Sequence, residues 1–118
     1  MKTLFLTFAL LLFSTALYVS TPPTTLIEGV CVVEFNASFN ASNSVVWVEE
    51  LSDCKGSRVD IAVNPDMQKE HKIVVVPTII IFNDGVEVKR FQANIMMQLE
   101  ASKGDVQEAV DDIIMSAF

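Results

Sequence analysis

"VVVPTIIIFNDGVEV", Val74 to Val88, carries the clearest fold signal in this sequence. Two runs rich in β-branched residues flank the tripeptide Asn83-Asp84-Gly85. Asn, Asp and Gly accept the positive φ angles of tight hairpin turns, and β-branched residues favour strands. The stretch therefore predicts two antiparallel strands joined by a short turn.

The rest of the chain adds alternating strands and helices around this hairpin. Apolar residues recur every three or four positions in the predicted helices, whereas a nearly continuous apolar run marks the first strand. In chain order we expect a strand at Gly29–Phe35, a helix at Ser44–Asp53 ended by Gly56, a strand at Arg58–Val63, a short helix capped by Asn64 and opened by Pro65, the hairpin, and a helix capped by Ser102. The fold class is thus α/β, ordered β-α-β-α-β-β-α, with helices flanking one mixed sheet.

Three segments resemble thioredoxins. They are "VVEFNA" (Val32–Ala37), the proline-containing stretch Val74–Val88, and "SKGDVQEAVDDII" (Ser102–Ile114). The twelve-residue spacing between Pro65 and Pro77 also resembles a proline pair of thioredoxin itself. The resemblance covers residues 27–118 and implies one thioredoxin-like domain.

The family's redox motif is replaced in this chain. Aligned on the resemblance, Asn40-Ala41-Ser42-Asn43 stands where thioredoxins have Cys-Gly-Pro-Cys. Disulfide exchange needs a thiolate to attack and a second thiol to resolve the mixed disulfide, and an amide can do neither. The family consists of disulfide oxidoreductases, but here we expect a degenerate turn with no catalytic residue.

The resemblance also implies a buried acid beneath this turn. Glu34 corresponds to the acid that accepts a proton from the second cysteine in the family, and Arg58 stands where the family usually has a lysine. A carboxylate beside a cation stays ionised. We favour a structural Glu34–Arg58 pair over proton transfer, because no thiol remains to serve.

Pro77, within Val76-Pro77-Thr78, matches a proline that is cis in the family. The residue before it there offers its backbone N–H and C=O to an extended client peptide. Two interpretations follow. Val76, Pro77 and Thr78 could form a peptide-binding edge that works by strand addition, or Pro77 could only shape the entry into the strand.

An insertion, Asn94–Ala101, separates the last strand from the last helix. It contains the apolar residues Ile95, Met96, Met97 and Leu99. Methionine-rich surfaces adapt to varied partners, so Met96 and Met97 could form a partner-binding lip. Alternatively the insertion packs over the degenerate turn.

Cys31 and Cys54 are the only cysteines, 23 positions apart. They could form a disulfide, but their strand parity places them on opposite faces, which favours Cys31 as a buried apolar residue. Two cysteines and one histidine, His71, do not make a zinc site, so we expect no metal and no cofactor. We expect His71 to be solvated and Trp47 to belong to the core.

The doubled "FNAS" places Asn36 and Asn40 in the acceptor pattern for N-glycosylation. This pattern arises often by chance. It matters only if the chain is exported in a eukaryote.

Export is suggested by the N-terminus. Lys2 precedes the uncharged apolar run Thr3–Val19, and "STPPTT" follows. Residues 1–19 are expected to be a signal peptide, with a membrane anchor or a helix packed in the domain as alternatives, and residues 20–26 a linker. We therefore expect an exported protein with possible membrane attachment through residues 3–19.

The formal net charge is −7, and no basic stripe exists, which argues against nucleic-acid partners. Three functions stay open. The chain could be a redox-inactive protein that binds a protein or extended peptide. It could instead be an oxidoreductase using Cys31 or Cys54, or a structural subunit of a membrane or envelope complex.

Overall fold

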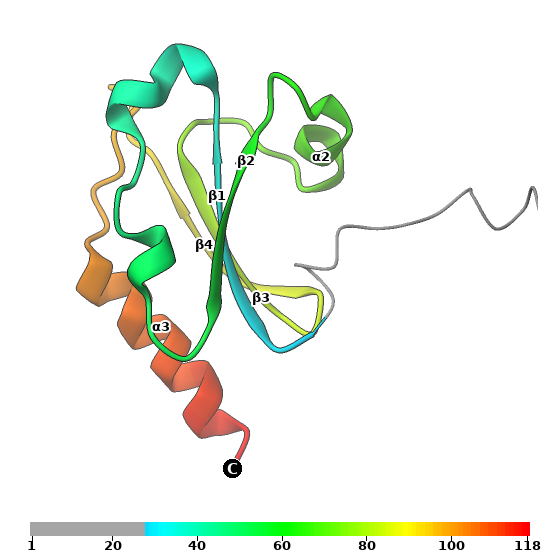
Figure 1. Cartoon of the computed structure of the whole chain (residues 1–118), viewed down its shortest axis with the longest axis vertical. Helices are drawn as coiled ribbons and strands as arrows, with labels where there is room; N and C mark the ends of the chain where they lie inside the picture. Colours follow the sequence, from blue (N-terminus) through cyan, green and yellow to red (C-terminus); the bar gives the residue numbers. More distant parts are fainter. Residues whose placement is uncertain (1–27) are drawn as a thin grey trace, which may run out of the picture.

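The computed structural model describes residues 28–118. The predicted signal or anchor segment 1–19, the predicted linker 20–26 and residue 27 of the predicted domain lie outside these residues. Four strands form one sheet in the order β2-β1-β3-β4 (Figure 1). Their bounds are β1 Val30–Asn36, β2 Lys55–Asp60, β3 Thr78–Asn83 and β4 Val86–Gln92.

The sheet is mixed, as predicted. β1 and β2 are parallel, whereas β1–β3 and β3–β4 are antiparallel. The hairpin turn is confirmed: Asp84 and Gly85 have φ of 50° and 82°, which suits this turn chemistry. The Asp84 carboxylate also accepts a hydrogen bond from the Gly29 N–H at 2.8 Å, so the turn fixes the start of β1.

Helices lie on both sides of the sheet. Figure 1 shows α3 (Lys103–Ser116) on one side and the short α2 (Pro65–Glu70) on the other. Ser102 caps α3 as expected, in a reciprocal capping box with Asp105. Asn64 does precede α2, but its side chain donates to the Asp60 carbonyl and gives no side-chain cap.

The prediction of a helix at Ser44–Asp53 is wrong. Within this range the chain forms only the short 3₁₀-helix η3 (Val48–Glu50), and another 3₁₀-helix, η2 (Ser38–Asn43), precedes it. Between them, the Glu34 carboxylate accepts hydrogen bonds from the Ser44 hydroxyl and the Val45 N–H. These bonds and the β-branched valines favour a non-helical backbone there.

Gly56 therefore does not end a helix; it lies inside β2, which also begins three residues earlier than predicted. A Cβ atom at Gly56 would lie 2.0 Å from the Val48 carbonyl oxygen. Only glycine lets η3 approach the strand this closely.

Two apolar cores fill the spaces on either side of the sheet. The core on the α3 side includes Val32, Val48, Ile79, Ile81 and Val106. The core on the α2 side includes Cys31, Val33, Phe35, Ile80 and Phe82. Alternate residues of β1 and β3 enter alternate cores, so the sheet is covered on both faces. Within residues 28–118, none of the helices has the length and apolar character that crossing a membrane requires.

Candidate functional site

Asn40 is the centre of the degenerate turn. It interrupts η2, with φ of −113° and ψ of 23°, and only 4% of its surface is exposed. Its side-chain nitrogen lies 3.2 Å from Asn36 Oδ1, 3.4 Å from the Val76 carbonyl oxygen and 3.2 Å from the Met97 carbonyl oxygen. An amide has two N–H groups, so the three acceptors share them.

The remaining amide atoms of the turn are also engaged. Asn40 Oδ1 accepts from Asn43 Nδ2 at 2.9 Å, and Asn36 Nδ2 donates to the Asn40 carbonyl at 3.2 Å. Ala41 and Ser42 lie at the exposed outer edge of the turn. The turn, the proline loop and the insertion are thus joined through one buried side chain. The sequence identified these segments separately but did not predict the Asn40 amide as their junction.

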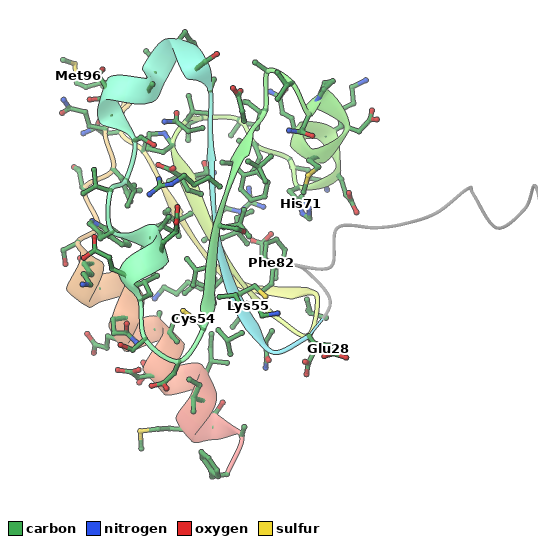
Figure 2. All side chains as sticks on the ribbon, viewed as in Figure 1. Glu28, Cys54, Lys55, His71, Phe82 and Met96 are labelled. Carbon is green, nitrogen blue, oxygen red and sulfur yellow. The ribbon has the colours of Figure 1, made fainter. Side chains whose placement is uncertain are left out.

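Neither cysteine lies at this turn, and both are free. Cys31 is buried in the α2-side core, whereas Cys54 packs against the α3-side core, as strand parity predicted. Figure 2 shows Cys54 far along the sheet from Met96 of the insertion. Burial raises the pKa of both thiols, that of Cys54 to about 11 with further contributions from Cys31, Asp53 and Asp111. Both are therefore poor nucleophiles at neutral pH.

Glu34 and Arg58 lie side by side on β1 and β2 and form an ion pair of 2.7 Å. The Glu34 side chain is 1% exposed and that of Arg58 is 34% exposed. The Ser44 hydroxyl donates to both carboxylate oxygens, at 3.0 and 3.2 Å, and Arg58 also contacts Glu49 at 3.1 Å. Arg58, the Ser44 hydroxyl and the Val45 N–H thus engage both oxygens of this buried carboxylate, which suits a structural role.

A cavity of about 160 Å³ adjoins this pair. Asn36, Ser44 and Asp60 contribute to its wall together with Glu34 and Arg58. In the described residues no group of three His, Cys, Asp or Glu side chains is placed to hold a metal ion, here or elsewhere.

The proline loop lies directly beside Asn40. The Val76–Pro77 peptide bond is cis, and Val76, Pro77 and Thr78 are all buried. The Thr78 hydroxyl donates to the Val75 carbonyl at 2.7 Å, and the Val76 carbonyl faces Asn40. Among residues 28–118, none accepts a hydrogen bond from the Val76 N–H.

The insertion is an ordered turn built on Asn94. The Asn94 side-chain oxygen accepts from the backbone N–H groups of Met96 and Gln98, and the Asn94 N–H donates to the Gln98 carbonyl. Leu99 packs against the α3-side core. Ile95, Met96 and Met97 are exposed by 99%, 67% and 45%. One part of the insertion therefore packs against the core, whereas another stays exposed beside η2 (Figure 2). A role of Met96 and Met97 in partner binding stays a prediction.

A groove of about 300 Å³, which we call the proline groove, lies between these elements. Its lining is apolar except for two amides and contains no charged residue. The lining residues are Phe39, Ile61, Gln68, Ile73, Val74, Val75, Val76, Asn94, Ile95 and Met97. Phe39 and Val74, exposed by 71% and 77%, enlarge this apolar surface. The sequence predicted Val76 and Met97 as binding residues but missed Phe39, whose exposure depends on the geometry of η2.

The expected solvation of His71 is wrong. Its side chain is 13% exposed and packs between Phe35 and Phe82, with ring centroids 5.4 and 5.2 Å away. His71 follows α2, and the Arg90 guanidinium donates to its carbonyl, which holds this segment against the sheet. A polar run of sequence gave no sign of this tertiary contact.

Asn36 and Asn40, the two glycosylation-pattern asparagines, are 7% and 4% exposed. Their amides are engaged in the hydrogen bonds described above. A glycan on either amide is incompatible with this folded structure.

Comparison with solved structures identifies the architecture. The chain is similar to a mutant thioredoxin from Halobacterium salinarum, with 19% identity, 72% of this chain and 74% of that chain covered, and a TM-score of 0.60. A thioredoxin from Malassezia sympodialis gives 20% identity, 75% and 77% coverage and a TM-score of 0.57. A thioredoxin from Fasciola hepatica has 21% identity, with 73% of this chain and 82% of that chain covered and a TM-score of 0.53.

No family model matches the chain, and no curated protein sequence is significantly similar to it. At these identities the similarity establishes the fold alone. The chain has the thioredoxin fold without a Cys-x-x-Cys pair, as the sequence predicted.

Proposed function

We propose that this thioredoxin-fold chain binds an extended apolar peptide segment of a partner protein in the proline groove and has no thiol–disulfide activity. The observation that carries the proposal is the juxtaposition of three segments around Asn40. They adjoin an apolar groove beside the turn that the resemblance aligns with the family's Cys-Gly-Pro-Cys motif.

The lining of the proline groove favours an uncharged occupant. A charged side chain entering it would lose hydration without gaining an opposite charge. Apolar side chains would remove exposed surface of Phe39 and Ile95 from water, at roughly 25 cal/mol per Å². An apolar peptide is therefore the partner chemistry that fits.

The backbone supports only limited strand addition. The Val76 N–H is available to a peptide carbonyl, whereas the Val76 carbonyl already accepts from Asn40 at 3.4 Å. A bound peptide would therefore accept from the Val76 N–H, and could donate to the Val76 carbonyl only by sharing this oxygen with Asn40 or by displacing Asn40. Affinity then depends chiefly on the apolar side chains.

The absence of disulfide chemistry is supported by the positions of the sulfur atoms. Cys31 and Cys54 lie on opposite faces of the sheet, with raised pKa values. The two thiols cannot form a disulfide with each other through the sheet. An insulin-reduction assay should give no turnover, and turnover abolished by Cys54→Ser would contradict the proposal.

Binding is tested with fluorescein-labelled, reduced and carboxymethylated α-lactalbumin, a permanently unfolded probe, by fluorescence anisotropy. Phe39→Ser and Ile95→Ser should each weaken binding. Val86→Ser is the matched control, because Val86 is also exposed, by 67%, but follows the hairpin turn at the opposite end of β3.

Equal binding by all variants would place the interaction elsewhere on the molecule. No binding at all, together with stable co-purification of one folded partner, would favour the structural-subunit function instead. We also propose that the chain acts outside the cytoplasm, on the basis of residues 1–19. Cell fractionation with a C-terminal epitope tag tests this proposal.

A further inference from the structure

We propose that Met97, with its neighbour Met96, is an oxidation site through which peroxide closes the proline groove to its partner. This inference rests on the proposed function, because it assigns a mode of regulation to the same groove. It is carried by the position of Met97 in the groove lining and by the exposure of both side chains.

The methionines of the described chain differ in exposure. Met67 packs against the α2-side core and is only partly exposed. Met96, Met97 and Met115 are exposed by 67%, 45% and 73%. Since oxidation of a thioether requires access by the oxidant, the last three are the reactive set. Of these, Met97 lines the proline groove, whereas Met115 is near the end of α3.

Met97 is held firmly in this position. Its backbone is left-handed, with φ of 57°, its N–H donates to the Asn94 carbonyl at 3.0 Å, and its own carbonyl accepts from Asn40 at 3.2 Å. The backbone at Met97 is therefore fixed from both sides. The Met97 side chain is therefore attached at a fixed point of the groove wall.

The chemistry needs only a peroxide and no metal. A lone pair of the thioether sulfur attacks one oxygen of hydrogen peroxide, the O–O bond breaks, an S–O bond forms, and water is released. The sulfur is oxidised by two electrons and the peroxide is reduced. The product is a sulfoxide, which converts a flexible apolar side chain into a polar one.

The proline groove is lined mainly by apolar side chains, which cannot form a hydrogen bond with this new polar group. Gln68 Nε2 already donates to the Ile73 carbonyl at 3.4 Å, and a sulfoxide oxygen that accepted from the Val76 N–H would compete with the peptide carbonyl for this donor. In the free protein water hydrates the sulfoxide, but a docked apolar peptide would strip this water away. We expect the affinity to fall by about tenfold or more.

The experiment treats the full chain with hydrogen peroxide and follows two readouts. Mass spectrometry should find Met96, Met97 and Met115 oxidised well before Met67. Anisotropy with the carboxymethylated α-lactalbumin probe should then show affinity lost in step with Met97 oxidation. The inference is overturned if Met97 is oxidised as slowly as Met67, or if the affinity for the probe is unchanged after Met97 is fully oxidised.

Two variants separate the effect at the groove from general damage. Met96→Leu/Met97→Leu should have the same affinity before and after peroxide, whatever that affinity is, because leucine does not oxidise. Met115→Leu should keep the full loss seen in the unaltered chain. Persistent peroxide sensitivity in the double variant would also overturn the inference.

The two proposals fail in different ways. If the untreated chain binds the probe and peroxide has no effect, the partner-binding function stands and only the oxidation site is wrong. If the untreated chain does not bind the probe, both proposals fall.

Discussion

The side-chain nitrogen of Asn40 lies 3.2 Å from the carbonyl oxygen of Met97, a residue 57 positions away in the chain. The same nitrogen faces the Val76 carbonyl. One buried amide thus joins the turn, the proline loop and the insertion. These three segments form a continuous, hydrogen-bonded surface.

Asn40→Ala should destabilise the fold. It leaves the buried Val76 carbonyl and the partly buried Met97 carbonyl without this donor and removes the acceptor of Asn43, so we expect the free energy of unfolding to fall by about 1–3 kcal/mol. Urea unfolding measures it. Ser42→Ala, in the same 3₁₀-helix but exposed, should change stability by less than about 0.5 kcal/mol. Equal effects of the two changes would show that the amide network contributes nothing specific.

Asn40→Cys/Asn43→Cys should form a disulfide across the turn, because the native amides already meet at 2.9 Å. Under oxidising conditions Cys31 and Cys54 should alkylate after denaturation, and the new pair only after reduction. The pair should nevertheless be a slow reductant of insulin, since η2 is a broken 3₁₀-helix and gives little of the helix-terminus field that lowers thiol pKa values. Failure to form this bond would argue against the alignment of the turn with Cys-Gly-Pro-Cys.

Arg58→Met should lower the free energy of unfolding by about 3 kcal/mol. This value is the lower end of the range for breaking a buried ion pair, because the Arg58 side chain is 34% exposed. The substitution leaves the Glu34 carboxylate with only the Ser44 hydroxyl and the Val45 N–H. Adding Glu34→Gln should recover part of the loss, since the neutral amide needs no counter-charge. A double-mutant cycle in urea measures this coupling, and strictly additive effects would contradict it.

Gly56→Ala should be strongly destabilising because its Cβ would lie 2.0 Å from the Val48 carbonyl oxygen. Overpacking of this kind costs about 1–3 kcal/mol or more. Gly104→Ala is the matched control: its Cβ would meet only Ser102 Oγ, at 3.6 Å, inside α3. That change should stabilise by about 0.5–1 kcal/mol. Thermal unfolding of the two variants tests the contrast, and a neutral Gly56→Ala would disprove the close approach.

Alkaline pH should weaken the fold through Cys54. Burial raises the pKa of this thiol from 9.0 to about 11, so between these values the folded state binds more protons than the unfolded state. The contribution of the buried Cys54 thiol to the free energy of unfolding is complete below pH 9 and is lost as the pH rises toward 11. The unaltered chain should therefore lose more stability than Cys54→Ser over this interval. If the stability of the unaltered chain and that of Cys54→Ser fell equally between pH 9 and 11, the effect of Cys54 burial would be contradicted.

Several features could be predicted from local sequence because neighbouring residues cause them. The Asn83-Asp84-Gly85 turn supplies positive φ angles, and Ser102 with Asp105 caps α3 within a few residues. Strand parity separated Cys31 from Cys54, since alternation along a strand does not depend on distant partners. The absence of sulfur from the turn is likewise a property of the sequence itself.

Other features were decided by contacts between distant segments. The apolar spacing at Ser44–Asp53 favours a helix, but the Glu34 carboxylate and the approach of η3 to Gly56 impose another backbone. His71 looks polar and solvated in sequence, yet two rings from β1 and β3 enclose it. The proline groove is lined by residues from Phe39 to Met97, which come together only in the fold, and Asn40 bonds to backbone groups 36 and 57 residues away beside it. Periodicity and propensity describe a chain one segment at a time, whereas a binding surface and its buried hydrogen bonds require the segments to be folded against one another.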